Sequence, residues 1–267
     1  MNRVREFYED AQKEWDRLDI PLCRIEFAST LALIDRYFTE GMTVFDVGGG
    51  PGRYTIELIK RGCKATLLDL SPENIALAKA KISEVGLAAE TLVGDARDLL
   101  KLTDRCFDGI LALGPLYHLC ERPERITFLK AARSRLSAGG ILIGAYLNTW
   151  GIARTLLADA PGWFDDRQRL DRVLTGGKFA GSNACPGFTE CHWCTPDEAQ
   201  DEFREAGFAI LDEIGAEGFA GGMRKEIAAI ANMDRAAFDR IVSFAVRTSS
   251  LPQYRRATDH LLLVGKT

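Results

Sequence analysis

The hydrophobic pattern of the chain changes once, near residue 41. Up to residue 40, apolar residues recur at helical spacing and Pro21 interrupts them, so we predict two helices there. From Met42 onward, short apolar runs bounded by glycine or acidic residues alternate with longer helical patterns, which is typical of βαβ units. We therefore predict an α/β protein with a mostly parallel sheet, preceded by a helical cap over residues 1–40.

The apolar runs that indicate strands cover residues 43–47, 64–69, 90–93, 107–113, 140–147, 208–214 and 260–265. The clearest helix between them covers residues 72–85, because Ser71 can cap it, Pro72 suits its first turn and Gly86 ends it. A further helix is expected over residues 196–206.

Two stretches depart from this alternation. Residues 149–194 are rich in Gly, Trp, Phe and Asp, and residues 216–257 have a helical pattern just before the last strand. Long insertions in a compact α/β domain often cover a site. The expected organisation is thus a core over 41–148, a lid or substrate insertion over 149–194, and a segment 195–267 that completes the sheet and carries the helical insertion.

Composition narrows the class of partner and the compartment. The 267 residues include 34 Lys plus Arg and 38 Asp plus Glu, and no run of five or more like charges occurs. Nucleic acid is therefore not an expected partner. The seven cysteines are scattered and odd in number, which suits a reducing cytosol. Neither a signal-peptide pattern nor a stretch of membrane-spanning length appears, so we expect a cytoplasmic protein without a membrane partner.

One cluster has metal-like spacing. Cys191 and Cys194 are separated by two residues, as zinc sites favour, with His192 between them and Cys185 nearby. A second pair of this kind is missing, and adjacent Cys191 and His192 cannot easily share one tetrahedral site. We therefore predict no metal site and interpret these residues as ordinary reduced cysteines.

A glycine-rich turn follows the first strand, in VFDVGGGPGRY, residues 44–54, and leads into a helix near Pro51. Glycines let the backbone approach a ligand closely and leave the N–H groups of the helix N-terminus free for it. A dinucleotide fingerprint needs a glycine at the sixth position from Gly48, where this chain has Arg53, so NAD is disfavoured. A tight strand-to-helix connection without a ligand is the simpler alternative.

Two acidic residues at strand ends favour the interpretation of the glycine turn as part of a nucleotide-like ligand site. Asp69 ends the second strand, where a carboxylate can accept hydrogen bonds from both ribose hydroxyls. Helix capping is its alternative role, but Ser71 and Pro72 already supply that helix start. Asp95 follows the third strand and can accept a hydrogen bond from an adenine amino group.

Five segments in order and spacing carry a family resemblance: VFDVGGGPGRY, LLDLSPENIALAKAK, GDARDL, FDGILALGPLYHL and LSAGGILIGAYLN. Together they resemble class I S-adenosylmethionine-dependent methyltransferases over residues 42–148. The resemblance implies a Rossmann-like seven-stranded sheet with an antiparallel last strand. It also implies which residues contact S-adenosylmethionine. The methionine part would contact Asp46, Gly48, Gly49, Gly50 and Gly52, and the ribose would contact Asp69 and Leu70. The adenine would contact Asp95 and Ala96, and the sulfonium would lie beside Leu113 and Gly114.

The opening helix, with FYEDAQKEWDRL, resembles a bacterial subgroup in which such a helix covers the cofactor. That resemblance would place Tyr8 and Trp15 near the ligand. Both residues equally suit the core-facing side of an amphipathic helix.

The methyl acceptor is not identified by the fold or the cofactor. GPLYHL, residues 114–119, replaces the motifs of adenine and cytosine methyltransferases and is similar to the broad small-molecule group that includes ubiquinone and menaquinone enzymes. Tyr117 and His118 follow the fourth strand; His118, with an ordinary pKa near 6.5, is either a general base with Tyr117 beside it or a packing residue. We expect methyl transfer to a small molecule; the alternatives are a peptide or protein acceptor, and a module that binds S-adenosylmethionine without catalysis.

Overall fold

The computed structural model describes residues 3–179 and 188–267, and its described strands form one nine-stranded sheet. The strands are β1 (Thr43–Val47), β2 (Lys64–Asp69), β3 (Glu90–Val93), β4 (Phe107–Ala112), β5 (Leu136–Asn148), β6 (Gly177–Phe179), β7 (Cys191–Cys194), β8 (Ala209–Gly215) and β9 (His260–Lys266). The first five lie parallel in the order β3-β2-β1-β4-β5, and β9 and then β8 continue the sheet antiparallel. The predicted Rossmann-like fold is confirmed.

The seven predicted strands are all present, and three of them, β1, β2 and β3, have the predicted bounds. β5 begins at Leu136 rather than Gly140, because Leu136 pairs with Phe107 before an irregularity in the register. The two additional strands, β6 and β7, come from the insertion over 149–194 and raise the count from seven to nine.

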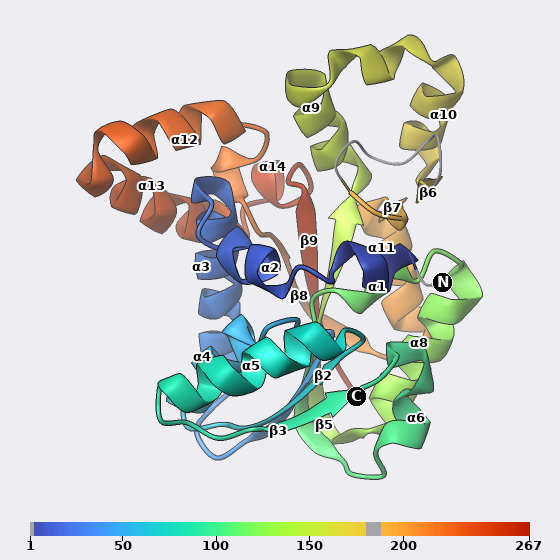
Figure 1. Cartoon of the computed structure of the whole chain (residues 1–267). Helices are drawn as coiled ribbons and strands as arrows, with labels where there is room; N and C mark the ends of the chain where they lie inside the picture. Colours follow the sequence, from blue (N-terminus) through green and yellow to red (C-terminus); the bar gives the residue numbers. More distant parts are fainter. Residues whose placement is uncertain (1–2, 180–187) are drawn as a thin grey trace.

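The described helices connect these strands and cover both faces of the sheet (Figure 1). They are α1 (Arg3–Phe7), α2 (Ala11–Arg17), α3 (Pro21–Tyr37), α4 (Arg53–Lys60), α5 (Pro72–Glu84), α6 (Leu99–Leu102), α7 (Pro115–His118), α8 (Arg122–Ser134), α9 (Thr149–Asp159), α10 (Arg167–Thr175), α11 (Pro196–Glu205), α12 (Arg224–Met233), α13 (Arg235–Thr248) and α14 (Pro252–Arg255). No helix in this described part of the chain is long and apolar enough to cross a membrane.

The N-terminal region holds three helices where the sequence predicted two. Asp10 starts α2, since its side chain accepts a hydrogen bond from the Lys13 N–H at 3.0 Å. Pro21 occupies the first turn of α3 rather than interrupting a longer helix. Figure 1 shows α1 and α2 (blue) lying between α5 and the 149–194 insertion.

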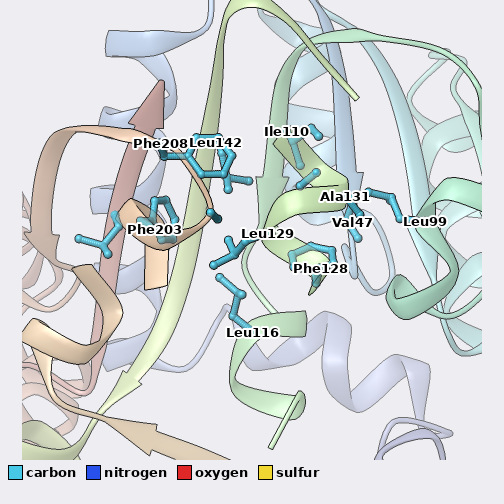
Figure 2. Close-up of a cluster of buried hydrophobic side chains, with 14 of the residues drawn as sticks. Val47, Leu99, Ile110, Leu116, Phe128, Leu129, Ala131, Leu142, Phe203 and Phe208 are labelled. Carbon is cyan, nitrogen blue, oxygen red and sulfur yellow. The ribbon is translucent and has the colours of Figure 1, made fainter. Parts of the chain in front are cut away.

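Alternate residues of the strands bury into two separate layers of the core. Phe45 of β1 packs in a cluster with Phe128 and Leu129 of α8, and Figure 2 shows part of that cluster. Val44, the preceding residue, packs on the opposite face of the sheet in a cluster with residues of α3 and α4. Both faces of the parallel strands are therefore covered, which fixes their carboxyl ends as the accessible edge.

The insertion over 149–194 has an aromatic core of its own. Trp163, Phe179 and Trp193 are buried together, and the Phe179 and Trp193 rings stack with centroids 3.7 Å apart. β7 pairs in parallel with the end of β5, and Leu147 of β5 pairs with both Trp193 and His260. Since β9 occupies the other edge of β5, β7 lies in line with β4, beyond the carboxyl end of that strand.

Candidate active site

A cavity of about 700 Å³ opens at the carboxyl ends of β1, β2, β3 and β4. Its walls are the glycine turn after β1, the end of β2, the turn after β3, the start of α7, and residues of α1, α2 and the segment after them. In an open α/β sheet, ligands bind at this edge, where the strand order reverses between β1 and β4.

The glycine turn forms one wall, through Gly48, Gly49 and Gly50. Gly50 has φ of +57°, a conformation that favours glycine. Gly49 has no room for a side chain, because a Cβ there would lie 2.4 Å from Oδ2 of Asp46. Gly52 caps α4 with φ of +84° and is not among the residues that line the cavity, so it shapes the turn from behind.

Asp69 lies at the end of β2 as predicted and lines the cavity, together with Leu70. Its carboxylate accepts hydrogen bonds from the Gly50 N–H at 2.8 Å, the Ser71 N–H at 2.9 Å and Nδ2 of Asn74 at 3.1 Å. Burial nevertheless raises its pKa above the ordinary value, and these hydrogen bonds offset only part of that effect. The carboxylate thus joins the glycine turn to the start of α5.

Asp46 is the most deeply buried acid of the cavity wall, with 1 % of its surface exposed. The Thr55 hydroxyl donates a hydrogen bond to Oδ2 of Asp46 at 2.7 Å. Burial raises the pKa of Asp46 to about 7, against an ordinary 3.8, despite that hydrogen bond. The folded protein therefore holds this carboxyl half-protonated near neutral pH.

Asp95 and Ala96 line the cavity beyond β3. The Asp95 carboxylate accepts hydrogen bonds from the Arg97 N–H at 2.9 Å and from Nη2 of Arg97 at 2.6 Å. Burial alone would raise the pKa of Asp95, but the hydrogen bonds and charge of Arg97 lower it overall. A carboxylate therefore stays ionised at this end of the cavity.

Leu113 and Gly114 line the cavity at the end of β4. A Cβ at Gly114 would lie 3.2 Å from the Gly48 carbonyl oxygen, so the turns after β1 and β4 are in close contact. This contact makes one continuous cavity from the glycine turn to α7.

The N-terminal region lines the cavity with one side chain that the sequence predicted and others that it did not. Tyr8 lines it as predicted, whereas Trp15 lies outside the lining and packs under the Arg53 guanidinium, 4.9 Å from the ring centroid. Glu14 and Arg17 line the cavity instead and form an ion pair at 2.9 Å. Glu14 lies directly against the glycine turn, since its Cγ is 3.7 Å from where a Cβ of Gly50 would be.

Tyr117 and His118 form the wall at the other end, on the single turn of α7. Nδ1 of His118 donates to the Glu190 carbonyl oxygen at 3.1 Å, since a carbonyl can only accept, and Nε2 therefore accepts from the Tyr8 hydroxyl at 3.0 Å. Burial lowers the pKa of His118 to about 4. This pKa lies below the unperturbed value of 6.5 because Tyr8 and Phe188, distant in sequence, enclose the ring.

The comparisons with known proteins agree with this geometry. Residues 44–140 match a family described as a methyltransferase domain. Ubiquinone biosynthesis O-methyltransferases are similar: that of Paramagnetospirillum magneticum is 30 % identical over 46 % of this chain and 49 % of the relative, and one from Cereibacter sphaeroides is 27 % identical over 66 % and 64 %. The matched part of the chain thus spans about half to two thirds of the length of these curated relatives.

Two solved structures share the fold over nearly the whole chain. The 1,6-didemethyltoxoflavin-N1-methyltransferase of Burkholderia thailandensis, with bound 1,6-didemethyltoxoflavin and S-adenosylhomocysteine, has a TM-score of 0.60 at 17 % identity and covers 98 % of this chain and 84 % of its own. The putative methyltransferase of Haloferax volcanii, in complex with the Trm112 methyltransferase activator, has a TM-score of 0.61 at 18 % identity and covers 100 % and 98 %.

Residues 44–140 form a methyltransferase domain, and the chain shares the fold of known methyltransferases. The cofactor that the sequence leads us to expect is S-adenosylmethionine. The lining of the cavity is compatible with that molecule, because it offers carboxylates that can accept hydrogen bonds and glycines that leave space for a ligand.

The cysteine cluster lies away from the cavity. Cys191, His192 and Cys194 are buried on β7, Nε2 of His192 bonds Oε1 of Glu198 at 2.9 Å, and Cys185 lies outside the described residues. Another cluster within the described part, Glu26, Glu217 and His260, has its ligand atoms within 4.8 Å of one another.

Ion pairs already fill this second cluster. Arg17 donates to Glu26 at 3.2 Å, and Nδ1 of His260 donates to Glu217 at 2.7 Å. Burial alone would lower the pKa of His260, but the charges of Glu26 and Glu217 raise it to about 9. The cationic Arg17 and His260 thus balance the two carboxylates and link α2 and α3 to β9.

Proposed function

We propose that this protein transfers the methyl group of S-adenosylmethionine to a small-molecule acceptor. The observation that supports this most directly is the single continuous cavity, which joins the glycine turn, Asp69 and Asp95 to the wall formed by Tyr8, Tyr117 and His118. A cofactor and an acceptor can then meet in one cavity, which methyl transfer requires.

The cofactor is proposed to lie along the sheet edge in the order expected from the sequence. Asp95 and Ala96 would hold the adenine, Asp69 and Leu70 the ribose, and the turn from Gly48 to Gly50, with Asp46, the methionine part. Gly52 contributes only through the shape of the turn.

We add Glu14 and Arg17 to the proposed cofactor site. The amino-acid end of S-adenosylmethionine carries an ammonium and a carboxylate, and Glu14 and Arg17 present opposite charges beside Gly50. Each charged group of the ligand would thus find a partner of opposite sign. Trp15 is not part of the proposal.

Leu113 and Gly114 would border the sulfonium, on the side of the cavity that Tyr117 and His118 line. In the transfer, a lone pair of the acceptor attacks the methyl carbon, the carbon–sulfur bond breaks, and its electron pair stays on the sulfur of S-adenosylhomocysteine. Holding the acceptor in line in a water-poor site supplies most of the acceleration.

His118 is a poor proton acceptor in this arrangement. Protonating a group with a pKa of about 4 at pH 7 costs about 4 kcal/mol, and Nε2 already accepts from Tyr8. We therefore propose that Tyr117 and His118 position the acceptor, and that any proton the acceptor loses goes to solvent rather than to His118.

Transfer of label from methyl-labelled S-adenosylmethionine tests the proposed function. The protein is incubated with a low-molecular-mass extract of its source cell and, separately, with the protein fraction. We expect label in the small-molecule extract and, at a concentration of S-adenosylmethionine well below saturation, roughly tenfold to a hundredfold less label with the Asp69→Ala variant. Label in the protein fraction would establish a peptide or protein acceptor instead, and binding of S-adenosylmethionine without any transfer would establish a non-catalytic module.

The cytoplasm is the proposed place of action. The support is the cysteine usage, since the seven cysteines of the sequence are scattered and odd in number, which suits a reducing compartment.

A further inference from the structure

A buried arginine on α8 lies outside the cavity and has no role in the proposed transfer so far. Arg125 is 1 % exposed, and all three of its guanidinium nitrogens donate hydrogen bonds to protein groups. Nε and Nη2 donate to the fully buried Glu202 at 3.0 and 2.7 Å, and Nη2 also donates to Glu198 at 3.1 Å. The Tyr146 hydroxyl of β5 donates to the same Glu202 carboxylate at 3.0 Å.

The remaining nitrogen of Arg125 reaches the backbone just after α7. Nη1 donates to the carbonyl oxygens of Leu119 at 2.9 Å and Cys120 at 3.0 Å. These residues directly follow His118, and α7 is a single turn. One turn of helix has too few internal hydrogen bonds to fix its own direction, so the external hydrogen bonds of Arg125 hold the end of α7.

The second support of His118 connects to the same guanidinium. The Glu190 carbonyl that accepts from His118 directly precedes β7. Nε2 of His192 in β7 bonds Oε1 of Glu198, which in turn accepts from Arg125. The segment that carries His118 and the segment that holds its ring are therefore both fastened to one buried ion pair.

We propose that Arg125 is a positioning residue of the acceptor site, which holds α7 and β7 at the spacing that orients His118 and Tyr117 toward the cavity. The planar fork of an arginine suits this task, because it can bond Glu202 on one edge and two carbonyl oxygens on the other. A lysine side chain has one nitrogen and cannot bond Glu202 and the two carbonyl oxygens at the same time. The proposal rests on the proposed function only for the importance of the wall to turnover.

Arg125→Lys tests the proposal, because it keeps the charge beside Glu202 and removes the fork. The main measurement is nuclear magnetic resonance of histidine labelled with nitrogen-15, which is tractable since the chain has three histidines. In the wild type, His118 should be neutral with the proton on Nδ1. In Arg125→Lys, we expect its resonances to move and its pKa to rise by about one unit or more, since water reaches the loosened ring.

Cofactor binding and turnover provide the second readout. We expect the affinity of Arg125→Lys for S-adenosylmethionine to stay within about threefold of the wild type, while turnover falls about tenfold. The matched control is Arg133→Lys, on the same helix, which changes an exposed arginine that donates to the Gly207 carbonyl oxygen at 3.0 Å and should alter neither His118 nor turnover. Unchanged His118 resonances and pKa in a folded Arg125→Lys variant would overturn the proposal, as would equal losses of cofactor affinity and turnover.

A second variant covers the case in which Arg125→Lys does not fold. Glu198→Ala removes a more exposed carboxylate and breaks only the link from Arg125 to β7 through His192. We expect a smaller change of the His118 resonances in the same direction, and no change would refute the proposal. The resonance readout does not depend on methyl transfer, so a failure of the proposed function and a failure of this proposal are distinguishable.

Discussion

Asp46→Asn should reveal the stability that the protein loses by burying a carboxyl under its glycine turn. The folded-state pKa of Asp46 is about 7, whereas the unfolded chain has the ordinary value of 3.8. The unfolded state therefore releases the proton first, and the free energy of unfolding falls as the pH rises from about 4 to about 7. Asparagine fits the same space and keeps an oxygen that can accept from Thr55.

The magnitude follows from the difference between the two pKa values. About three pH units correspond to about 4 kcal/mol at pH 8, of which about 2 kcal/mol develop between pH 5 and pH 7. An unpaired amide N–H in the variant costs roughly 1 to 3 kcal/mol, but that cost is the same at every pH. The dependence on pH, rather than the absolute stability, therefore carries the test.

Urea unfolding of the cofactor-free protein between pH 5 and pH 8 measures this difference. We expect the stability of Asp46→Asn relative to the wild type to increase up to about pH 7 and then level off. Asp104→Asn, which changes a fully exposed carboxyl, is the control and should follow the wild type throughout. A difference between Asp46→Asn and the wild type that stays constant from pH 5 to pH 8 would refute the reasoning.

Two further predictions concern the acceptor wall and the insertion. His118→Asn should lower turnover about tenfold, because it releases the Tyr8 hydroxyl. The dependence of turnover on pH between 6 and 9 should stay as in the wild type, because the pKa of His118 is about 4. Loss of a pH step in the variant would show that His118 is a base. Phe179→Ala should lower the free energy of unfolding of the insertion by about 3 to 5 kcal/mol, because it opens the aromatic core. Hydrogen exchange over residues 149–179 should accelerate while S-adenosylmethionine still binds. Unchanged exchange there would contradict a separate core.

Local motifs explain why much of the cofactor site could be predicted. The glycine turn, Asp69 and Asp95 each lie within a few residues of a strand end, and the strand order of an open α/β sheet brings those ends together. Their burial and hydrogen bonds need no knowledge of distant contacts. The prediction of the residues that line this side of the cavity agrees with the structure except at Gly52, which lies just behind the turn.

The contributions of the N-terminal helices could not be predicted in the same way. Glu14 and Arg17 have the composition of a solvated helix face, and they line the cavity only because α2 docks against α5 and the glycine turn. That docking also packs Trp15 against the hydrophobic cluster of α4, β2 and α5, beside Arg53, as the core-facing alternative expected. A helical period indicates which residues share a face but not which face meets the ligand.

The acidity of His118 and the role of Arg125 depend on contacts over long sequence distances. The His118 ring is enclosed by Tyr8 and Phe188, and Arg125 pairs with Glu202, 77 residues away. The short strands β6 and β7 were missed for a related reason. They lie in a glycine-rich segment without alternating polarity and form strands only by pairing with each other and with β5.

Calorimetric titration of S-adenosylmethionine and NAD tests most directly the claim that this cavity is built for S-adenosylmethionine. We expect S-adenosylmethionine to bind and NAD not to bind. Loss of a hydrogen-bonded charge costs about 1.5 to 3 kcal/mol, so Asp69→Ala should weaken the affinity for S-adenosylmethionine roughly tenfold to a hundredfold. Binding of NAD, or an unchanged affinity of Asp69→Ala for S-adenosylmethionine, would contradict the account.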